Sequence, residues 1–228
     1  MSKFISIEEA VKLIPDGASV MFGGFMGCGN AHKFIDALSK SGVKDLTMIC
    51  NDGSMPGGFM GEDYYGVAKL IHNKQIKKLI ATHVGLNPEV GIQSFDGSLE
   101  TILVPQGSFV EMIRASGAGL GGVLTPTGVG TIIEDSPLCL GKQTINGRDY
   151  LLMAPIHADV ALLGTYKCDE SGNCWYKGTM RNFNPVMATA ADLVIAETEY
   201  VVPVGEIEPE NIHTYGICVD YIVEGEKK

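Results

Sequence analysis

A recurring order of apolar strand, glycine- or asparagine-containing turn and helical pattern restricts the fold of this chain more than any other feature. Four apolar runs show this order, at residues 19–25, 46–50, 78–85 and 101–107. Runs that are apolar on both faces are typical of strands buried in a parallel sheet, with helices as the crossover connections. Because ligands bind beyond the carboxyl ends of such strands, we expect the functional residues in the turns.

The second half of the chain continues this pattern and interrupts it once. Residues 158–166 and 191–202 predict two further buried strands, with a short helix at 184–191 between them. The pair Asn146-Gly147 inside residues 144–152 is a type I′ hairpin signal. We therefore predict an α/β fold: a mostly parallel open sheet, covered on both faces, with an antiparallel hairpin insertion. No linker or repeat divides the 228 residues, so we expect a single domain over residues 1–228.

Two helices have clear boundary signals. Ser6 and Glu9 have the spacing of a capping box at the start of residues 6–14. A second helix follows residues 19–25, with Asn30 as its expected N-cap and Gly42 near its end. Its apolar face has the helical spacing i, i+3, i+4, i+7 and consists of Ala31, Phe34, Ile35 and Leu38.

The charge balance excludes one class of partner. The formal net charge is −10, so no basic stripe is available to neutralise the phosphates of a nucleic acid. The nearest basic group is more simply a solvated face before a strand; it consists of Lys74, Lys77 and Lys78. No charged segment followed by an apolar one begins the chain, and no apolar run reaches about 18 residues. We expect a cytoplasmic protein that does not bind membranes.

The cysteines and histidines give no metal signal. None of the six cysteines forms a CxxC pair, and Cys168 and Cys174 match no common zinc spacing, so we expect free thiols. None of the five histidines has HExxH or HxH spacing, so we expect no metal site. Cys28, beside a predicted helix start and four residues before His32, is open to a second interpretation as a nucleophile.

The glycine-rich stretch at residues 16–31, DGASVMFGGFMGCGNA, does not fit a nucleoside triphosphate site. Gly24 and Gly29 have the separation of the two P-loop glycines. However, Asn30 and Ala31 stand where that loop needs lysine and a hydroxyl group for the phosphates and Mg²⁺. The stretch is therefore not predicted to hydrolyse nucleotides.

A dinucleotide site fits the same stretch only in part. Gly27 and Gly29 begin a GxGxxG pattern, but His32 occupies the place of its third glycine. Asp52 follows the second strand and could contact the ribose of a dinucleotide, so a dinucleotide site stays an alternative. A further alternative is that the glycines only make a tight connection. We favour a third interpretation, in which glycine backbone next to a helix start makes a slot for an anionic or thin ligand such as coenzyme A.

Residues 16–31 resemble the signature of the alpha subunits of family I coenzyme A transferases, of the acetate/butyrate–acetoacetate and 3-oxoacid type. The match runs from Asp16 to Gly29, and Ala31 replaces the proline that ends the signature. Similar segments follow in the same order along essentially the whole chain: LTMICND, VPQGSFVEMIRASGAGLGGVLTPTGVGT, ADVALL, RNFNPVMATAADLVIAE and GICVDYIV. The departures are Tyr215, where proline is usual, and the insertion-like loop at residues 53–66.

The resemblance implies a ping-pong transfer of coenzyme A between carboxylic acids, through a glutamyl-CoA thioester on the enzyme. The family's nucleophile lies in an SENG-like sequence of a separate β subunit, and no glutamate of this chain precedes Asn-Gly. We therefore expect an inactive single chain that works in an αβ or α2β2 assembly, with no permanent cofactor and coenzyme A as a substrate. Acetoacetate, butyrate and acetate are the acids that the resemblance favours. The alternative is a non-catalytic α/β domain that senses a sugar phosphate or an acyl-CoA.

The resemblance also assigns site residues, none of them catalytic. The expected coenzyme A contacts are Gly23, Gly24, Phe25, Met26, Gly27, Cys28 and Gly29. We expect the amide of Gln106 to donate to a substrate carboxylate, and Asn51 to be a weaker candidate of the same kind; purely structural roles are the alternative for both. Gly119, in the glycine-rich segment 116–122, is expected to bind substrate near the strand ends, with a plain loop as the alternative. Glu111 and Arg114 are expected to form a structural ion pair on a helix.

Overall fold

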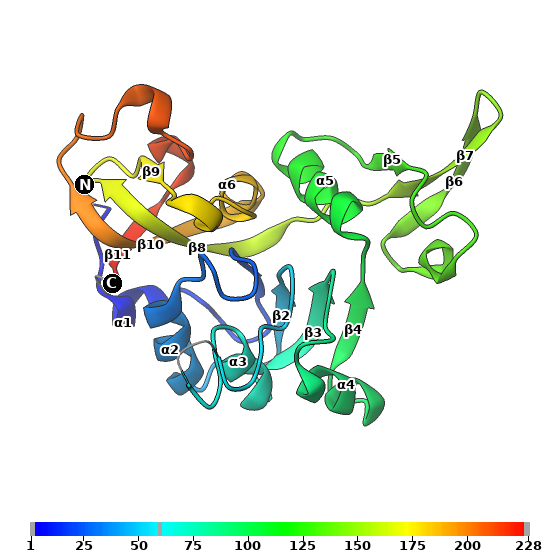
Figure 1. Ribbon diagram of the computed structural model, residues 1–228, viewed down its shortest axis with the longest axis horizontal. Helices are drawn as coiled ribbons and strands as arrows, with labels where there is room; N and C mark the ends of the chain where they lie inside the picture. Colours follow the sequence, from blue (N-terminus) through cyan, green and yellow to red (C-terminus); the bar gives the residue numbers. More distant parts are fainter. Residues whose placement is uncertain (1–2, 59–60, 226–228) are drawn as a thin grey trace.

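Parallel strands form the main sheet of the structure, a computed structural model that describes residues 3–58 and 61–225 (Figure 1). Its strands are β1 (Ser19–Phe22), β2 (Leu46–Ile49), β3 (Ile76–Ala81), β4 (Glu100–Leu103), β8 (Ala158–Asp169), β9 (Cys174–Trp175), β10 (Ala191–Val202) and β11 (Tyr221–Glu224). Within the described residues the order is β11-β10-β8-β1-β2-β3-β4, all parallel, and β9 pairs antiparallel with β8. The predicted parallel sheet is confirmed.

The direction of strand addition reverses at β1. From β1 the chain adds β2, β3 and β4 on one side, and then crosses back to place β8 on the other side of β1. Such a reversal leaves a crevice at the carboxyl ends of the two strands that flank it, where ligands of open α/β sheets bind. The ends of β1 and β8 therefore mark the first place to look for a site.

Helices cover both faces of the sheet, as predicted. They are α1 (Ile7–Val11), α2 (His32–Lys40), α3 (Ala68–His72), α4 (Pro88–Phe95), α5 (Gln106–Gly117) and α6 (Asn184–Met187). Along β1, Val20 and Phe22 point into the core shared with α1 to α4, whereas Met21 points into the core shared with α5 and α6. This alternation is the two-residue period of a strand buried on both faces.

One predicted helix boundary is confirmed and another is wrong. Ser6 caps α1, and its hydroxyl and the Glu9 carboxylate form both contacts of a capping box. Asn30 is not the N-cap of α2: Ala31 holds that position and supplies no capping side chain. The side chain of Asn30 instead donates from Nδ2 to the Gly23 carbonyl at 2.6 Å. Tertiary contact with the preceding turn thus competes successfully with local capping.

The predicted hairpin is confirmed as part of a three-stranded arm. Strands β5 (Val123–Thr125), β6 (Cys139–Ile145) and β7 (Arg148–Met153) form an antiparallel sheet of order β5-β7-β6, which extends away from the main sheet (Figure 1). Asn146 and Gly147 have φ values of 52° and 78°, and a type I′ turn requires both to be positive.

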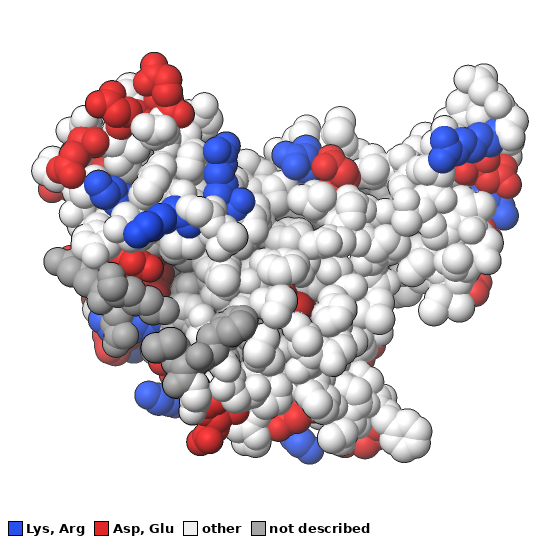
Figure 2. All heavy atoms as spheres, in the orientation of Figure 1, with Lys and Arg blue, Asp and Glu red and all other residues white. Residues whose placement is uncertain are grey.

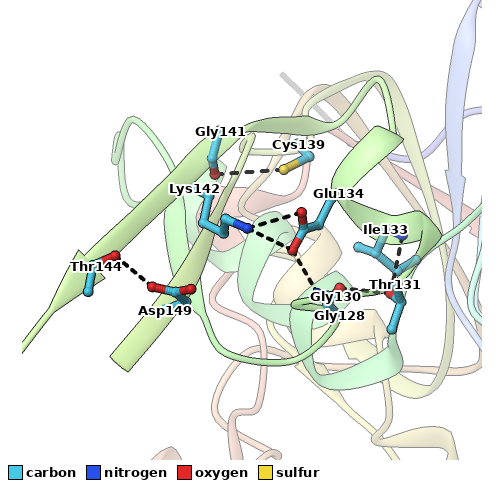
Figure 3. Close-up of polar contacts among 10 residues, drawn as sticks. All are labelled: Gly128, Gly130, Thr131, Ile133, Glu134, Cys139, Gly141, Lys142, Thr144 and Asp149. Carbon is cyan, nitrogen blue, oxygen red and sulfur yellow. Dashed lines mark hydrogen bonds and ion pairs between the residues drawn. The ribbon is translucent and has the colours of Figure 1, made fainter. Parts of the chain in front are cut away.

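Polar contacts fold the β5–β6 connection back onto this arm (Figure 3). The connection contains the short helix η1 (Ile132–Asp135), and the carboxylate of Glu134 accepts from the Gly130 amide at 2.7 Å. The same carboxylate forms an ion pair of 3.3 Å with Lys142 on β6. Thr144 donates to Asp149 across the hairpin at 2.6 Å. Because this part of the arm buries little apolar surface, these polar contacts help to hold its conformation.

The remaining segments are short. They contain η2 (Gly178–Met180), η3 (Pro209–Asn211) and η4 (Gly216–Cys218). Residues 59 and 60 of the insertion-like loop lie outside the described residues. No helix within residues 3–58 and 61–225 is long and apolar enough to cross a membrane. All six cysteines are free thiols, as predicted, although the sulfurs of Cys168 and Cys174 approach to 3.6 Å across β8 and β9.

Replacing Gly91 with alanine is expected to stabilise the chain by about 0.5–1 kcal/mol, the usual difference in helix propensity. Gly91 lies on the exposed side of α4, its φ is negative, and an added Cβ would meet no atom within 4 Å. The measurement is the free energy of urea unfolding. An unchanged or lower stability would contradict the open, helical environment of Gly91.

Candidate active site

The glycine loop, residues 23–29, follows β1 and forms a tight turn. Phe25 and Cys28 exchange two backbone hydrogen bonds, of 3.1 and 2.9 Å. Between them Met26 and Gly27 have φ values of 48° and 83°, the pair of positive values that defines a type I′ turn. Position 27 needs glycine for two reasons. Its φ is positive, and a Cβ there would lie 1.9 Å from the ring of Tyr65. The sequence therefore specifies a rigid turn at this point.

A buried asparagine ties the end of this loop to the sheet. Asn184, at the start of α6, has no exposed surface. Its Oδ1 accepts from the Gly164 amide at 3.1 Å, and its Nδ2 donates to the carbonyls of Gly29 and Met180, both at 3.0 Å. A Cβ on Gly23 would lie 1.7 Å from this Oδ1, so only glycine fits there. One side chain thus connects the glycine loop, β8 and η2.

Asp52 holds the other side of the loop. Its carboxylate is buried and accepts from the amides of Met26 and Ser54, each at 2.8 Å. The sequence alone suggests Asp52 only as a ribose ligand. Both its carboxylate oxygens accept from backbone amides, so the position of Asp52 supports the loop and gives no support to a dinucleotide site.

A cavity of about 300 Å³ opens beside the loop, beyond the carboxyl end of β1 and against the middle of β8, where the strand order reverses. The loop, α2, β8 and β10 all contribute to its walls. The lining side chains and backbone include Gly27, Cys28, Gly29, Lys33, Tyr65, Gly164, Thr165, Glu197 and Glu199. The amides of Gly27 and Gly29, two residues of the cavity wall, donate to no group among the described residues. A thin ligand with amide or anionic groups fits such walls.

Charged side chains line the cavity itself, among them Lys33, Glu62, Lys69, Glu197 and Glu199. Figure 2 shows further charged side chains over the lobe around β9 and on the arm, whereas the middle of this face is mostly uncharged. Large apolar side chains stay exposed on the arm: Leu124, Ile132, Leu140 and Ile145.

Cys28 is exposed in the loop, but His32 is poorly placed to activate it. The Nε2 atom of His32 lies 2.9 Å from the Gly27 carbonyl and 3.2 Å from the Tyr65 hydroxyl. Because a carbonyl only accepts, Nε2 must carry the proton in that contact. Nε2 is then unable to take a proton from the thiol, and the arrangement gives no support to a Cys–His nucleophile.

The residues predicted to contact the substrate, Gln106 and Asn51, do not lie together in one site. Gln106 is the exposed first residue of α5, directly after β4, and so lies at the carboxyl edge as expected. Asn51 also lies at this edge, but it is buried and one of its amide hydrogens is donated to Thr82 at 2.9 Å. Neither residue lines the cavity beside the glycine loop.

The prediction that segment 116–122 lies near the carboxyl ends of the strands is wrong. Its first two residues end α5, and Ser116 contacts His157, just before β8 begins, at 3.1 Å. At 1.5 Å per residue, Gly119 lies roughly 20 Å along the helix direction from Gln106. Helix α5 runs back along the sheet and carries Gly119 to the opposite edge of the sheet. Glu111 and Arg114 form the predicted ion pair, of 3.1 Å.

Comparison with known proteins identifies the fold and its relatives. The family described as Coenzyme A transferase matches residues 4–225. The chain is 47% identical over 223 residues to the acetoacetyl-CoA:acetate/butyrate CoA transferase alpha subunit of Clostridium acetobutylicum, covering 98% of each chain. It is 42% identical over 224 residues to the acetate CoA-transferase subunit alpha of Escherichia coli K12, covering 97% of this chain and 96% of the relative.

Solved structures share the fold. An acyl-CoA transferase from Escherichia coli O157:H7 superposes with a TM-score of 0.85 at 20% identity, covering 98% of this chain. The present chain spans only 47% of that protein's length. Glutaconate coenzyme A-transferase from Acidaminococcus fermentans superposes with a TM-score of 0.82 at 19% identity, covering 99% of this chain and 76% of the other.

Proposed function

Because this chain belongs to the coenzyme A transferase family, as an alpha subunit of the acetate, acetoacetate and succinyl-CoA:3-ketoacid type, we propose that it supplies half of a shared active site. The complete enzyme moves coenzyme A between an acyl-CoA and a short-chain carboxylic or 3-oxo acid. Acetoacetate, butyrate and acetate are the acids that the names of its relatives favour. The name alpha subunit implies a β partner.

The proposed chemistry is covalent. A glutamate carboxylate of the partner attacks the acyl carbonyl, the carbon–sulfur bond breaks, and coenzyme A leaves as a thiolate. The thiolate attacks the glutamyl carbonyl of the resulting anhydride, and the first acid leaves as a carboxylate. A second acid then reverses both steps, so two easier acyl transfers replace one difficult exchange. The absence of a Glu-Asn-Gly sequence from this chain supports a nucleophile on the partner.

The observation that carries this proposal is the fixed glycine loop beside a cavity at the point of strand reversal. Gly27, Cys28 and Gly29 line this cavity, whereas Gly23, Gly24, Phe25 and Met26 do not. In the proposed complex the unpaired amides of Gly27 and Gly29 contact coenzyme A first, and the other residues of the loop, Gly23, Gly24, Phe25, Met26 and Cys28, complete the proposed contacts. Gln106, exposed at the same edge of the sheet, donates to the acid carboxylate. The hold of Asn184 and Asp52 on the loop supports this assignment, because a preorganised backbone loses less entropy on binding.

The purified chain alone is expected to transfer no coenzyme A from acetoacetyl-CoA to acetate, and addition of a cognate β chain is expected to restore transfer. Borohydride added with acetoacetyl-CoA reduces the glutamyl thioester, and peptide mass spectrometry then locates the modified residue. We expect the label on the β chain. Activity of the single chain, or a label on Glu62 or Glu199 of the cavity wall, would contradict the division of roles.

A further inference from the structure

Glu197 on β10 is a buried carboxylate that the proposed chemistry does not use. Its Oε1 accepts from the Lys33 amide at 3.2 Å, and its Oε2 accepts from the Phe34 amide at 2.7 Å. Only 8% of the residue is exposed. The first amides of a helix have no partner within the helix, and the N-cap residue of α2, Ala31, offers no side chain to them. A carboxylate from the sheet therefore takes the place of the missing capping group.

The carboxylate has little freedom to move. The Thr165 hydroxyl donates to the backbone carbonyl of Glu197 at 3.1 Å, which fixes the strand at that point. On the other side Gly225 packs against the side chain, and a Cβ there would lie 3.1 Å from Oε1. Because α2 begins three residues after the glycine loop ends, a hold on its first turn is also a hold on the loop.

We propose that Glu197 is a positioning residue: it fixes the glycine loop by gripping the first turn of α2, and this grip weakens when its carboxyl group takes up a proton. A carboxylate accepts from two N–H groups at once. When the carboxyl group is protonated, one of its oxygens carries a hydrogen and becomes a donor. That oxygen still faces a backbone N–H group, which is also a donor, so this hydrogen bond is lost. The consequence for acyl-CoA binding rests on the proposed function, whereas the grip itself does not.

The charge state changes near neutral pH. Burial raises the pKa of Glu197 to about 7, and the amides of Phe34 and Lys33 oppose that rise without cancelling it. The charge of Lys33 also lowers the pKa of Glu197, and that of Asp36 raises it. Further titratable groups line the same cavity: Cys28, His32, Glu62, Tyr65, Lys69 and Glu199. On the neighbouring strand β11, Glu224 lies close enough for its carbonyl to accept from Lys33 at 3.4 Å.

Stability and positioning respond to pH in opposite directions. Because the folded-state pKa of Glu197 lies above its ordinary value of 4.5, the folded chain keeps a proton that the unfolded chain releases between pH about 4.5 and about 7. The contribution of Glu197 to folding stability therefore falls as pH rises through this window. Its grip on α2 strengthens over the upper part of the same window.

The test compares Glu197→Gln with the wild type in the α/β complex, using acetoacetyl-CoA and acetate between pH 5.5 and 8.5. Glutamine mimics the protonated carboxyl group at every pH. We expect the variant to have a KM for acetoacetyl-CoA roughly three- to tenfold above wild type at pH 8, the effect of losing one charge-assisted hydrogen bond at a distance from the ligand. The ratio should approach one at pH 5.5. Glu197→Asp, which keeps a titratable group, should retain a pH-dependent KM.

The exposed Glu224, on the adjacent strand, supplies the matched control, and Glu224→Gln should have the wild-type KM at every pH. A Glu197→Gln variant whose KM follows wild type across the range would overturn the positioning role. A second readout needs no activity: amide hydrogen exchange at Lys33 and Phe34 in the full chain. There wild type should gain protection over Glu197→Gln between pH 6 and pH 8. If the expected difference in exchange is found but the complex has no transferase activity, the proposed function alone is rejected. If wild type and Glu197→Gln are equally protected at both pH values, the positioning role is rejected.

Discussion

Replacement of Asn184 with alanine is expected to lower the free energy of unfolding by about 3–5 kcal/mol, because it leaves two buried groups and one half-buried group unpaired, at about 1–3 kcal/mol for each buried group before relaxation. Those groups are the amide of Gly164 and the carbonyls of Gly29 and Met180. The glycine loop then loses its connection to β8. We also expect coenzyme A transfer by the α/β complex to fall by about a hundredfold, the usual scale for a misplacement of about 1 Å.

Urea unfolding of the chain and the kcat/KM of the complex measure the two effects. Asn211, exposed at the end of η3, supplies the matched control, and Asn211→Ala should stay within about 0.5 kcal/mol of wild type. If Asn184→Ala cost less than about 1 kcal/mol, Asn184 would not be the main connection between the loop and the sheet.

Replacement of Gly164 with alanine is expected to reduce kcat/KM by about a hundredfold while costing only about 1–3 kcal/mol of stability. An added Cβ would lie 2.4 Å from the carbonyl oxygen of Gly29 and 2.5 Å from that of Asn30. Both are backbone atoms, so the end of the glycine loop must shift. The φ of Gly164 is not positive, and the effect is therefore steric and not a consequence of backbone strain.

The matched control is Gly91→Ala, the same change at a glycine with open space around it, which should leave activity unchanged. A crystal structure of Gly164→Ala should show displaced carbonyls at residues 29 and 30. Wild-type kcat/KM in a folded Gly164→Ala complex would separate the loop position from catalysis and so argue against the proposed role of the loop.

Much of the fold was predictable because its signals are local. The apolar runs, the Ser6–Glu9 capping box and the Asn146-Gly147 turn act within a few residues, and all three predictions are confirmed. The family was also predictable, since residues 16–31 and the later segments keep their order along the chain. The prediction for Asn30 failed because its side chain binds a carbonyl of the preceding glycine loop, seven residues earlier. The prediction for segment 116–122 failed because α5 runs to the opposite edge of the sheet, where Ser116 contacts His157.

The sequence by itself determined the class of fold, the turn at the glycine loop and membership of the family, since strand patterning, positive φ and ordered sequence similarity are all readable along one chain. Only the tertiary structure decided what holds that turn in place. Asp52, Asn184 and Glu197 are up to 164 residues away from the backbone groups that they bind. No periodicity or spacing reveals such contacts. They exist because the strands are parallel and the strand order reverses at β1, so that β8 and β10 lie on one side of the loop that follows β1 and the end of β2 lies on the other.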